Sequence, residues 1–580
     1  MRVAEAVGRT LVELGVEQAF GVVGSGNFHA TNALTDHGGR FVASRHEAGA
    51  ALMADAYARL TGRVAVVSLH QGCGLTNAMT ALTESAKSGS PVVVIVGDTP
   101  PTARHTSNFW IDQAGALRAL GIEVARVHSA RTAVADTAAA HRLALEHGRT
   151  VVLNMPLDVQ EEDVEWSPAS VPAAVPVHVP APDPAGADEI ARLLASADRP
   201  VIVAGRGARH ARAELERLAE ASGALLATSA VARGLFAGNP WALDVMGGFS
   251  SPGVADLIAG ADLIVGLGVA LNRWTCRNGD LVANARLVHV DRDAAAIGKH
   301  RSVHLGVVGD AALTATAVTD RLSTWARGSS ARGPEAGSAP ASPAGTSNGF
   351  AAGSAPGGAA PREGYRSARV RALLDSGVLW PDVPYEDTSG DGRIDPRTLT
   401  LALERVIPAE RVVVTDAGNF TGYPANFLSV PDARGMILPL AFQSIGLSLG
   451  IGVGAAVTRP DRQVVVAVGD GGFMMSLVEL DTAVRERLPL MVVVYNDSAY
   501  GAEIHHFDAG DDMTTVTFPE TDVAAIARGF GCEGVTVREV GDVEQVRAWL
   551  DGDRSRPLVV DAKTTVLRSW VEEHVFQGDA

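Results

Sequence analysis

The sequence has few of the residues that define several classes of protein. Its 580 residues include only 3 cysteines, Cys73, Cys276 and Cys532, which lie too far apart in the chain for a disulfide framework or a metal cluster. No apolar run reaches the ~18 residues of a membrane span, and Arg and Glu interrupt the N-terminus too often for a signal peptide. The formal charge is −17, and no segment supplies the basic surface that nucleic-acid binding needs. We therefore expect a cytoplasmic protein with neither a membrane nor a nucleic-acid partner.

The composition is that of a globular protein, with 47% hydrophobic and 20% charged residues. The chain is too long for one hydrophobic core. Short apolar runs bounded by Gly or Pro, such as 64–69, 91–97 and 463–470, alternate with helical patterns and indicate buried parallel strands. These patterns predict an α/β protein made of three consecutive domains, each with an open, mainly parallel sheet.

The domain boundaries follow from changes in composition. We predict an N-terminal domain at 1–167, a central domain at 187–325 and a C-terminal domain at 395–566. A Pro/Ala/Val stretch at 168–186 predicts an extended linker. Residues 326–394 are predicted as a low-complexity linker, in which the Gly/Ser/Ala/Pro-rich insert 327–361 is expected to be disordered.

A carboxylate between glycines follows one of the predicted strands. Asp470 comes directly after the apolar run QVVVAVG, an amphipathic stretch follows, and the next strand ends at Asn496 and Asp497. Because adjacent parallel strands end at the same edge of a sheet, these side chains should meet there, beside a helix N-terminus. Oxygen ligands at such an edge suit a hard divalent cation and a diphosphate, although a lone glycine turn without a ligand is the simpler alternative.

The stretch 469–497 resembles the cofactor motif of thiamine-diphosphate enzymes, in which GDG precedes N-N or N-D by a strand-helix-strand interval. The superfamily includes acetolactate synthases, pyruvate decarboxylases and benzoylformate decarboxylases, and the resemblance covers nearly the whole chain outside the 327–361 insert. It implies pyrimidine-binding, central and diphosphate-binding domains in that order. It also implies thiamine diphosphate and Mg²⁺ as cofactors. The implied metal ligands are Asp470, Asp497 and the carbonyl of Ala499. The implied cofactor-binding residues also include Gly469, Gly471, Gly472, Asn496, Tyr500 and Gly501.

A second resemblance lies in the N-terminal domain. Glu47 begins a helix rich in Ala and Met after the predicted strand RFVASR, a position that the helix dipole alone would favour for an acid. The segment 41–62 also resembles the superfamily pattern RHE-x-x-A-x-x-M-A-D-x-Y-A-R. The resemblance implies that Glu47 activates the cofactor, which in relatives is held by the other subunit. We therefore expect at least a homodimer and, beyond it, a homotetramer.

Two further segments resemble cofactor-lining stretches of the superfamily. Ile445, in the Gly-rich context SIGLSLG, matches the residue that bends the cofactor in decarboxylases, whereas a core isoleucine is the plainer interpretation. Asn419 follows the strand RVVVTD and is expected to line the cofactor site.

The residues expected near the substrate resemble those of two different enzyme groups. Ser25 and His70 stand where benzoylformate decarboxylase has an active-site serine and histidine, and a histidine there could shuttle a proton. The GCGLTN sequence after His70 instead resembles the G-P-G-x-T-N of acetolactate synthases, and Asp112 and Gln113 resemble a synthase substrate region in which Trp110 replaces a glutamine.

Two weaker patterns remain. The glycine-rich turn of VIVAGRGARHA (201–211) is compatible with the FAD that some relatives hold, but DVMGGFSSPG (244–253) departs from the flavin-binding sequence, so FAD is possible and not favoured. The segment 385–398 resembles a calcium loop but has Thr398 at its twelfth position, and we interpret it as a polar entry that caps the following helix.

The leading hypothesis is an enzyme, a lyase or transferase, that decarboxylates a 2-oxo acid and transfers the acyl-anion equivalent to a carbonyl acceptor, as an acetolactate synthase does. A simple decarboxylase of the benzoylformate decarboxylase type is the alternative. A non-catalytic regulatory or binding subunit with the same fold is the alternative of another class.

Overall fold

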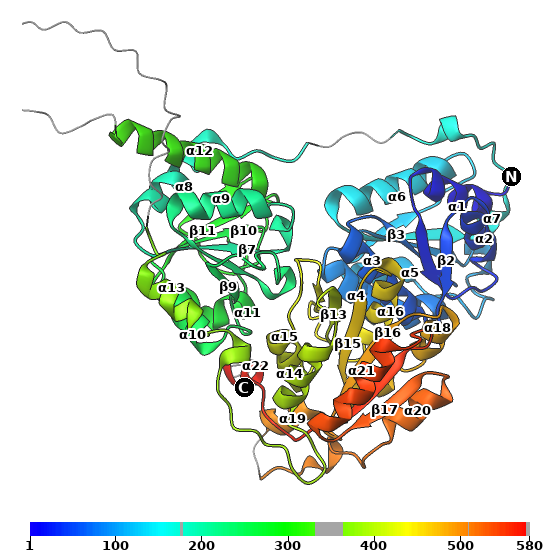
Figure 1. The fold of residues 1–580 in the computed structure, drawn as a ribbon. Helices are drawn as coiled ribbons and strands as arrows, with labels where there is room; N and C mark the ends of the chain where they lie inside the picture. Colours follow the sequence, from blue (N-terminus) through cyan, green and yellow to red (C-terminus); the bar gives the residue numbers. More distant parts are fainter. Residues whose placement is uncertain (174–177, 331–362, 508–509, 576–580) are drawn as a thin grey trace, which may run out of the picture. The chain divides into compact units, whose positions relative to one another are not determined.

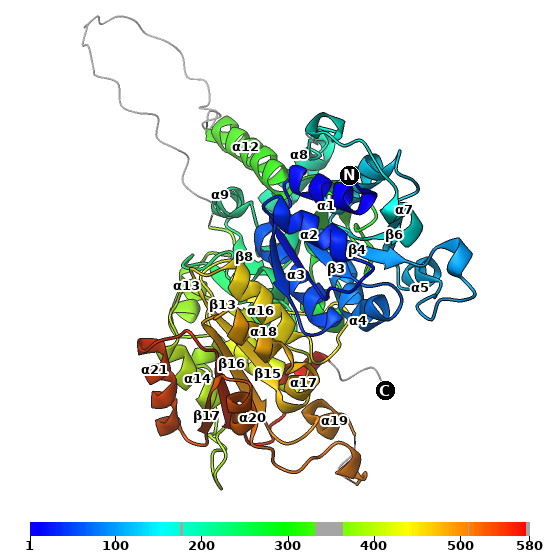
Figure 2. The same cartoon turned by 90° about the vertical axis from the view of Figure 1, so that its right-hand side faces the viewer.

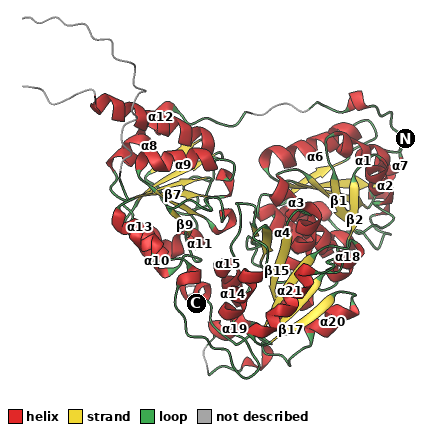
Figure 3. Ribbon diagram, in the orientation of Figure 1, coloured by secondary structure: helices red, strands yellow, loops and turns green. Residues whose placement is uncertain are grey.

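The computed structural model describes residues 1–173, 178–330, 363–507 and 510–575. The chain forms two compact units, one made of Met1–Val177 with Pro384–Ala580 and the other of His178–Val383. The first unit contains two parallel six-stranded sheets and the second contains one, with helices between successive strands (Figures 1 and 3).

The N-terminal sheet has the strand order β2-β1-β3-β4-β6-β5, and every pairing in it is parallel. Its strands are β1 (Gln18–Gly21), β2 (Arg40–Ala43), β3 (Ala65–Leu69), β4 (Val92–Asp98), β5 (Glu123–Arg126) and β6 (Thr150–Pro156). Its helices are α1 (Val3–Glu13), α2 (Phe28–Asp36), α3 (Glu47–Thr61), α4 (Cys73–Lys87), α5 (Gln113–Ala119), α6 (Ala133–His147) and α7 (Leu157–Glu161). The central strands β3 and β6 are buried along their whole length, as their apolar runs predict.

The C-terminal sheet repeats this arrangement with the order β14-β13-β15-β16-β18-β17, again all parallel. Its strands are β13 (Arg411–Val414), β14 (Met436–Ile437), β15 (Gln463–Gly469), β16 (Leu490–Asn496), β17 (Glu533–Val537) and β18 (Leu558–Lys563). Its helices are α14 (Pro396–Val406), α15 (Gly422–Phe427), α16 (Ser448–Thr458), α17 (Asp470–Ser476), α18 (Glu479–Arg485), α19 (Gly501–His506), α20 (Val523–Gly529), α21 (Glu544–Asp551) and α22 (Trp570–Val575).

One apolar core joins these two sheets through helices α3 and α16, which pack side by side (Figure 2). Glycines on α16 allow the backbones to approach closely. A Cβ atom added at Gly454 would lie 2.5 Å from the Cα of Met53, and one added at Gly450 would lie 3.2 Å from the Cα of Gly49. The N- and C-terminal sheets therefore belong to one packed body although about 200 residues of chain separate them.

The second unit has the strand order β12-β11-β10-β7-β8-β9, also parallel. Its strands are β7 (Pro200–Ala204), β8 (Leu225–Thr228), β9 (Ala242–Val245), β10 (Leu263–Leu267), β11 (Arg286–Asp291) and β12 (Leu305–Val308). Its helices are α8 (Pro184–Ser196), α9 (Arg212–Ser222), α10 (Pro252–Ala259), α11 (Arg273–Cys276), α12 (Ala311–Ser330) and α13 (Ala368–Asp375). Three parallel open sheets confirm the predicted fold class.

The structure differs from the sequence expectations at the linkers. Residues 184–186, predicted as linker, begin α8, because Asp183 accepts a hydrogen bond from the amide of Gly186 and Pro184 occupies the first turn. Part of the predicted linker 326–394 is also folded: α13 packs on the central core, to which Tyr365, Val370 and Val378 contribute large apolar side chains. Most of the insert 327–361, from residue 331 on, lies outside the described residues.

Two other segments show how local sequence sets element boundaries. The amphipathic stretch after Asp470 forms two short helices, α17 and α18, instead of one. The calcium-like segment caps α14, since Asp395 accepts a hydrogen bond from the amide of Arg397, as predicted. None of the helices in the described ranges combines the length and the hydropathy that a membrane crossing requires.

Candidate active site

Two carboxylates meet at the carboxyl ends of β15 and β16. The parallel register places Gly469 beside Tyr495, so Asp470 and Asp497 follow at the same edge, as predicted. Burial raises the pKa of Asp470 to about 6; burial and the neighbouring Asp470 charge raise that of Asp497 to about 7. The Oδ1 atom of Asp470 is buried without a hydrogen-bond donor among the described residues. Two like charges with an unsatisfied oxygen form a donor set that a divalent cation would fit.

The turn after β16 shapes this edge. Asp497 Oδ1 accepts a hydrogen bond of 3.2 Å from the amide of Ala499, and Ser498 has a φ of 62°, a strained value for a residue with a side chain. The carbonyl of Ser498 accepts the amide of Phe518 at 2.8 Å, and the amide of Tyr500 donates to the carbonyl of Val516 at 2.9 Å, so neither bond uses the carbonyl of Ala499. That carbonyl belongs to the same turn as the Asp497 carboxylate.

The glycines of the motif make room for close contacts. A Cβ atom at Gly471 would lie 2.5 Å from the ring of Tyr500, and one at Gly501 would lie 2.6 Å from Asp497 Oδ2. At Gly472 it would lie 3.0 Å from Asp416 Oδ2, whereas at Gly469 it would stand 3.3 Å from the Phe420 ring. The first three of these positions therefore have little space for a larger side chain.

Two predicted cofactor residues direct their side chains elsewhere. The buried Asn496 donates its amide to Asp561 Oδ1 at 2.9 Å. Asn419 donates to the carbonyl of Leu567 at 2.7 Å and accepts from the amide of Ser569 at 2.8 Å, which fastens the C-terminal segment to this domain. Both side chains are committed to protein partners. The sequence could not show these partners, because they lie 65 to 150 residues away along the chain.

Ile445 lies on a half-buried loop and not in the core, so the core interpretation does not hold. The loop is fastened by Asp416, a fully buried residue that the sequence analysis did not select. Asp416 Oδ2 accepts the amide of Gly446 at 2.9 Å and the hydroxyl of Ser448 at 3.0 Å. Burial raises the pKa of Asp416 to about 6. Its signal in the sequence is an acid close behind an apolar strand, with only Thr415 between them, which is similar to the signal that selected Asp470.

A second group of side chains gathers at the carboxyl edge of the N-terminal sheet. Glu47 begins α3, accepts a hydrogen bond of 3.0 Å from Asn77 Nδ2, and is partly exposed. A Cβ atom at Gly74 would lie 3.2 Å from the Cβ of His70 and 3.5 Å from Glu47 Oε1, so these residues are neighbours. The predicted acid and the predicted histidine are therefore brought together.

Ser25 and His70 also meet. The Ser25 hydroxyl lies 3.4 Å from His70 Nε2, while His70 Nδ1 lies 3.1 Å from the carbonyl of Gln71. A proton on Nδ1 would satisfy that carbonyl and leave Nε2 free to accept from Ser25. The ring of Phe109 packs against the imidazole, with centroids 4.8 Å apart.

Gln113 supports the turn that follows His70. Its Oε1 accepts the amide of Gly72 at 2.7 Å, and its Nε2 donates to the carbonyl of Gly97 and to Asn154 Oδ1. The Asp112 carboxylate caps α5 by accepting the amide of Gly115. These residues act within the fold of the N-terminal domain.

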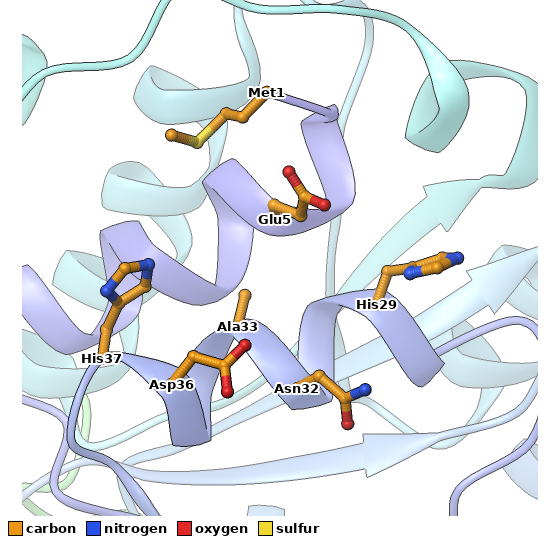
Figure 4. Close-up of a pocket in the computed structure, with 7 residues that line it drawn as sticks. All are labelled: Met1, Glu5, His29, Asn32, Ala33, Asp36 and His37. Carbon is orange, nitrogen blue, oxygen red and sulfur yellow. The ribbon is translucent and has the colours of Figure 1, made fainter.

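Other candidate sites lack side chains that converge as ligands would in the described part of the chain. A hollow of about 230 Å³ lies between α1 and α2, where Glu5, His29 and Asp36 stand apart on the two helices (Figure 4). Within the described ranges, three or more His, Cys, Asp or Glu side chains nowhere converge as metal ligands would. In the calcium-like segment, the Asp395 carboxylate is instead paired with Arg397 at 2.5 Å.

The glycine-rich turn of the central domain packs against itself. A Cβ atom at Gly205 would lie 2.2 Å from the carbonyl of Gly268, and the amide of Gly207 donates to that carbonyl at 3.0 Å. Packing of the two turns after β7 and β10 therefore explains these glycines without a nucleotide.

Comparison with known proteins identifies the family to which the chain belongs. Three thiamine pyrophosphate enzyme family models match in succession: the N-terminal TPP binding domain at residues 1–144, the central domain at 187–318 and the C-terminal TPP binding domain at 416–562. The chain belongs to the thiamine-pyrophosphate-dependent enzymes. The central match contains its whole sheet, and the two TPP binding domain matches cover most of the strands of theirs. The three matches confirm the predicted resemblance and the enzyme class.

Curated relatives within this family have different activities. A sulfoacetaldehyde acetyltransferase of Castellaniella defragrans is 28% identical, with 98% of this chain and 92% of the relative covered. A probable acetolactate synthase large subunit of Methanococcus aeolicus is 26% identical over 86% of this chain and 81% of the relative. A probable 2-ketoarginine decarboxylase of Pseudomonas aeruginosa is 28% identical over 93% and 90%. The family of this thiamine enzyme thus includes both acyl transfer and decarboxylation.

Proposed function

We propose that the protein is a thiamine-diphosphate- and Mg²⁺-dependent enzyme that decarboxylates a 2-oxo acid and transfers the acyl-anion equivalent to a carbonyl acceptor, in the manner of acetolactate synthases. The observation that carries the proposal is the buried pair Asp470 and Asp497, with one oxygen free of hydrogen-bond donors in the described structure. A cation bound there would relieve the repulsion and hold a diphosphate beside the start of α17.

The roles of the residues follow from their positions. Asp470, Asp497 and the carbonyl of Ala499 would bind Mg²⁺. Thiamine diphosphate, when bound, would supply a nucleophilic carbon for addition to a 2-oxo group and a cationic ring that takes up the electron pair left by CO₂. Glu47 would hold a proton at the aminopyrimidine ring, and the loop that Asp416 fastens would carry Ile445 against the bent cofactor. The remaining proposed cofactor contacts are Gly469, Gly471, Gly472, Tyr500 and Gly501. Asn419 and Asn496, the other predicted cofactor residues, would support the site through the hydrogen bonds of their side chains to Leu567, Ser569 and Asp561.

A simple decarboxylase is the second candidate, and the approach of Ser25 to His70 favours it. An imidazole whose Nε2 accepts from a serine hydroxyl is suited to relay a proton to the carbon that has lost CO₂. The synthase and transferase relatives instead favour a carbon acceptor. The two candidates share every cofactor residue and differ only in what receives the electron pair.

Analysis of the reaction products distinguishes the carboligase from the simple decarboxylase. Purified protein is incubated with thiamine diphosphate, Mg²⁺ and pyruvate, and the mixture is followed by proton NMR. Acetolactate as the product would establish the synthase-type carboligase, whereas acetaldehyde alone would establish the decarboxylase. If pyruvate is unchanged, larger 2-oxo acids and sulfoacetaldehyde, the substrate in one relative's name, are tested in the same way.

The Glu47→Gln variant tests the catalytic assignment. The amide retains the size of the side chain but holds no transferable proton, so we expect turnover to fall by about 10²- to 10⁴-fold while metal-dependent cofactor binding is retained. Steady-state rates and cofactor titrations measure both quantities. Full activity in this variant would refute the proposed role of Glu47.

A further inference from the structure

A buried carboxylate outside the proposed site holds the start of the Glu47 helix. Glu479, the first residue of α18, is 2% exposed and belongs to the C-terminal domain. Its Oε1 accepts the amide of His46 at 3.0 Å, and its oxygens lie 3.3 and 3.4 Å from the amide of Arg45. Its Oε2 accepts the hydroxyl of Thr482 at 2.7 Å. A buried carboxylate is costly without such donors, so the Arg45–His46 backbone is a required partner.

Further contacts hold the same segment at the start of α3. Arg45 Nε donates to Asp481 Oδ2 at 2.7 Å, which ties the segment to α18 a second time. A Cβ atom at Gly49 would lie 2.1 Å from Glu479 Oε1, so the first turn of α3 rests directly on the carboxylate. His46 Nδ1 in turn accepts the amide of Ala48. The residues on both sides of Glu47 are thus held by α18 or by the cap that it supports.

We propose that Glu479 is a positioning residue for Glu47, by which the C-terminal domain sets the place of the acid that the N-terminal domain carries. The proposal rests on the proposed function of Glu47. The described hydrogen bonds of Glu479 go to Thr482 and to the two backbone amides before Glu47. The side chain of Glu47 itself accepts a hydrogen bond from Asn77. A small shift of those amides displaces the Glu47 carboxylate as a whole.

Because of the position of Glu479 in the chain, its loss should affect the active site on the other subunit. Helix α18 follows α17, which begins at Asp470, so Glu479 lies close in the chain to the proposed metal site of its own subunit. In the proposed homodimer, Glu47 serves the cofactor of the other subunit. Loss of Glu479 would then impair the site on the partner and spare the site whose metal ligands lie on the same chain.

The first experiment uses Glu479→Ala and Glu479→Gln in the full-length protein with thiamine diphosphate and Mg²⁺. The measured quantities are the cofactor affinity and the rate at which the cofactor's reactive carbon exchanges its proton for deuterium, read by quenched-sample NMR. A displaced Glu47 should slow the exchange by about 10- to 100-fold in Glu479→Ala. Glu479→Gln keeps one acceptor oxygen for His46 and should recover part of the rate, with cofactor affinity little changed in both.

A matched control separates this role from a general loss of structure. Glu486→Gln removes a carboxylate from the same region that pairs with Arg40 at 2.9 Å and should leave the exchange rate unchanged. Unchanged exchange in folded Glu479→Ala, or in folded Glu479→Gln if the alanine variant does not fold, would overturn the proposal. So would a weakened cofactor affinity with normal exchange at saturation, because that result assigns Glu479 to its own metal site.

Mixed dimers provide the second test. Glu479→Ala chains combined with Asp470→Asn chains should regain activity, because one site then has an intact Glu47 and intact metal ligands. Glu479→Ala combined with Glu47→Gln should not. The reverse pattern would overturn the proposal.

The reference mixture is Glu47→Gln with Asp470→Asn, which regains activity only if Glu47 acts across the subunit interface. Failure of the reference mixture refutes that part of the proposed function. The exchange rates of the single variants then still decide the role of Glu479, since they do not depend on which subunit's cofactor Glu47 serves.

Discussion

Single carboxylates in this enzyme differ in what surrounds their oxygens. Asp416 and Glu479 are buried and accept backbone amides, which keeps two loops in place. Asp470 and Asp497 follow neighbouring strand ends, where Asp497 accepts the amide of Ala499 and Asp470 retains an oxygen without a donor in the described part of the chain. Carboxylates whose oxygens accept backbone amides stabilise the fold, whereas a pair of carboxylates that repel each other is suited to bind a cation.

The pH dependence of metal binding should report the Asp470 and Asp497 pair. Since the pKa values in the free protein are raised to about 6 and about 7, the pair holds protons at mildly acid pH that a cation must displace. Mg²⁺ affinity should therefore increase as the pH rises from about 5.5 to 8, with proton release on binding. Calorimetric titration with Mg²⁺ and thiamine diphosphate in buffers of different ionisation enthalpy measures both. An affinity independent of pH over this range would contradict the assignment.

At the scale of helices and loops, each domain of the first unit holds a segment of the other. Glu479 of the C-terminal domain accepts the amides before Glu47, and Glu84 of the N-terminal domain accepts the amide of Phe442 at 2.7 Å, on the loop that leads to Ile445. Glu84 is itself paired with Arg59 at 2.8 Å. Each domain therefore helps to position a segment of the other domain, namely the start of α3 with Glu47 and the loop with Ile445.

The packing of α3 on α16 should tolerate no added methyl group. Gly454→Ala would place a Cβ 2.5 Å from the Cα of Met53, and we expect it to lower stability by about 1–3 kcal/mol. Gly529→Ala, in a helix where nothing lies within 4 Å of the added Cβ, should be neutral or slightly stabilising. Thermal unfolding midpoints of both variants test this difference in sign. Equal midpoints would show that the helices separate without cost.

The sequence predicted the strand edges well because buried parallel strands are apolar runs that end in glycine or an acid, as at Gly469 and Asp470. It also brought Ser25, Glu47 and His70 into consideration through family patterns. It could not show that Asn419 and Asn496 point to distant partners, or that Glu479 holds the start of α3, because such contacts join residues far apart in the chain. Local patterns carry no information about them.

At the scale of the whole molecule, an exposed apolar surface is consistent with the proposed dimer. Met474, Met475 and Val478, on α17 and the turn after it, are 47%, 56% and 40% exposed in the single chain. Adjacent exposed apolar side chains beside a functional edge are typical of an interface.

Met475→Asp should therefore weaken self-association and reduce activity, because a charge would be buried in the interface. Leu145→Asp, at a 48% exposed residue of α6, is the matched control and should change neither property. Sedimentation velocity over a range of concentrations measures the association. A Met475→Asp protein that remains dimeric and active would exclude this surface.

The burial of α3 by α16 also bears on how the chain is made. Helix α3 is buried from Gly49 to Ala58, and its partner at Ser448–Thr458 is translated about 390 residues later. At ribosomal speeds of about 5–20 residues per second, that delay is roughly 20 to 80 s. During this interval α4 and the strands β1 and β3 can already pack on α3, but the face of α3 that contacts α16 has no native partner until the last third of the chain emerges from the ribosome.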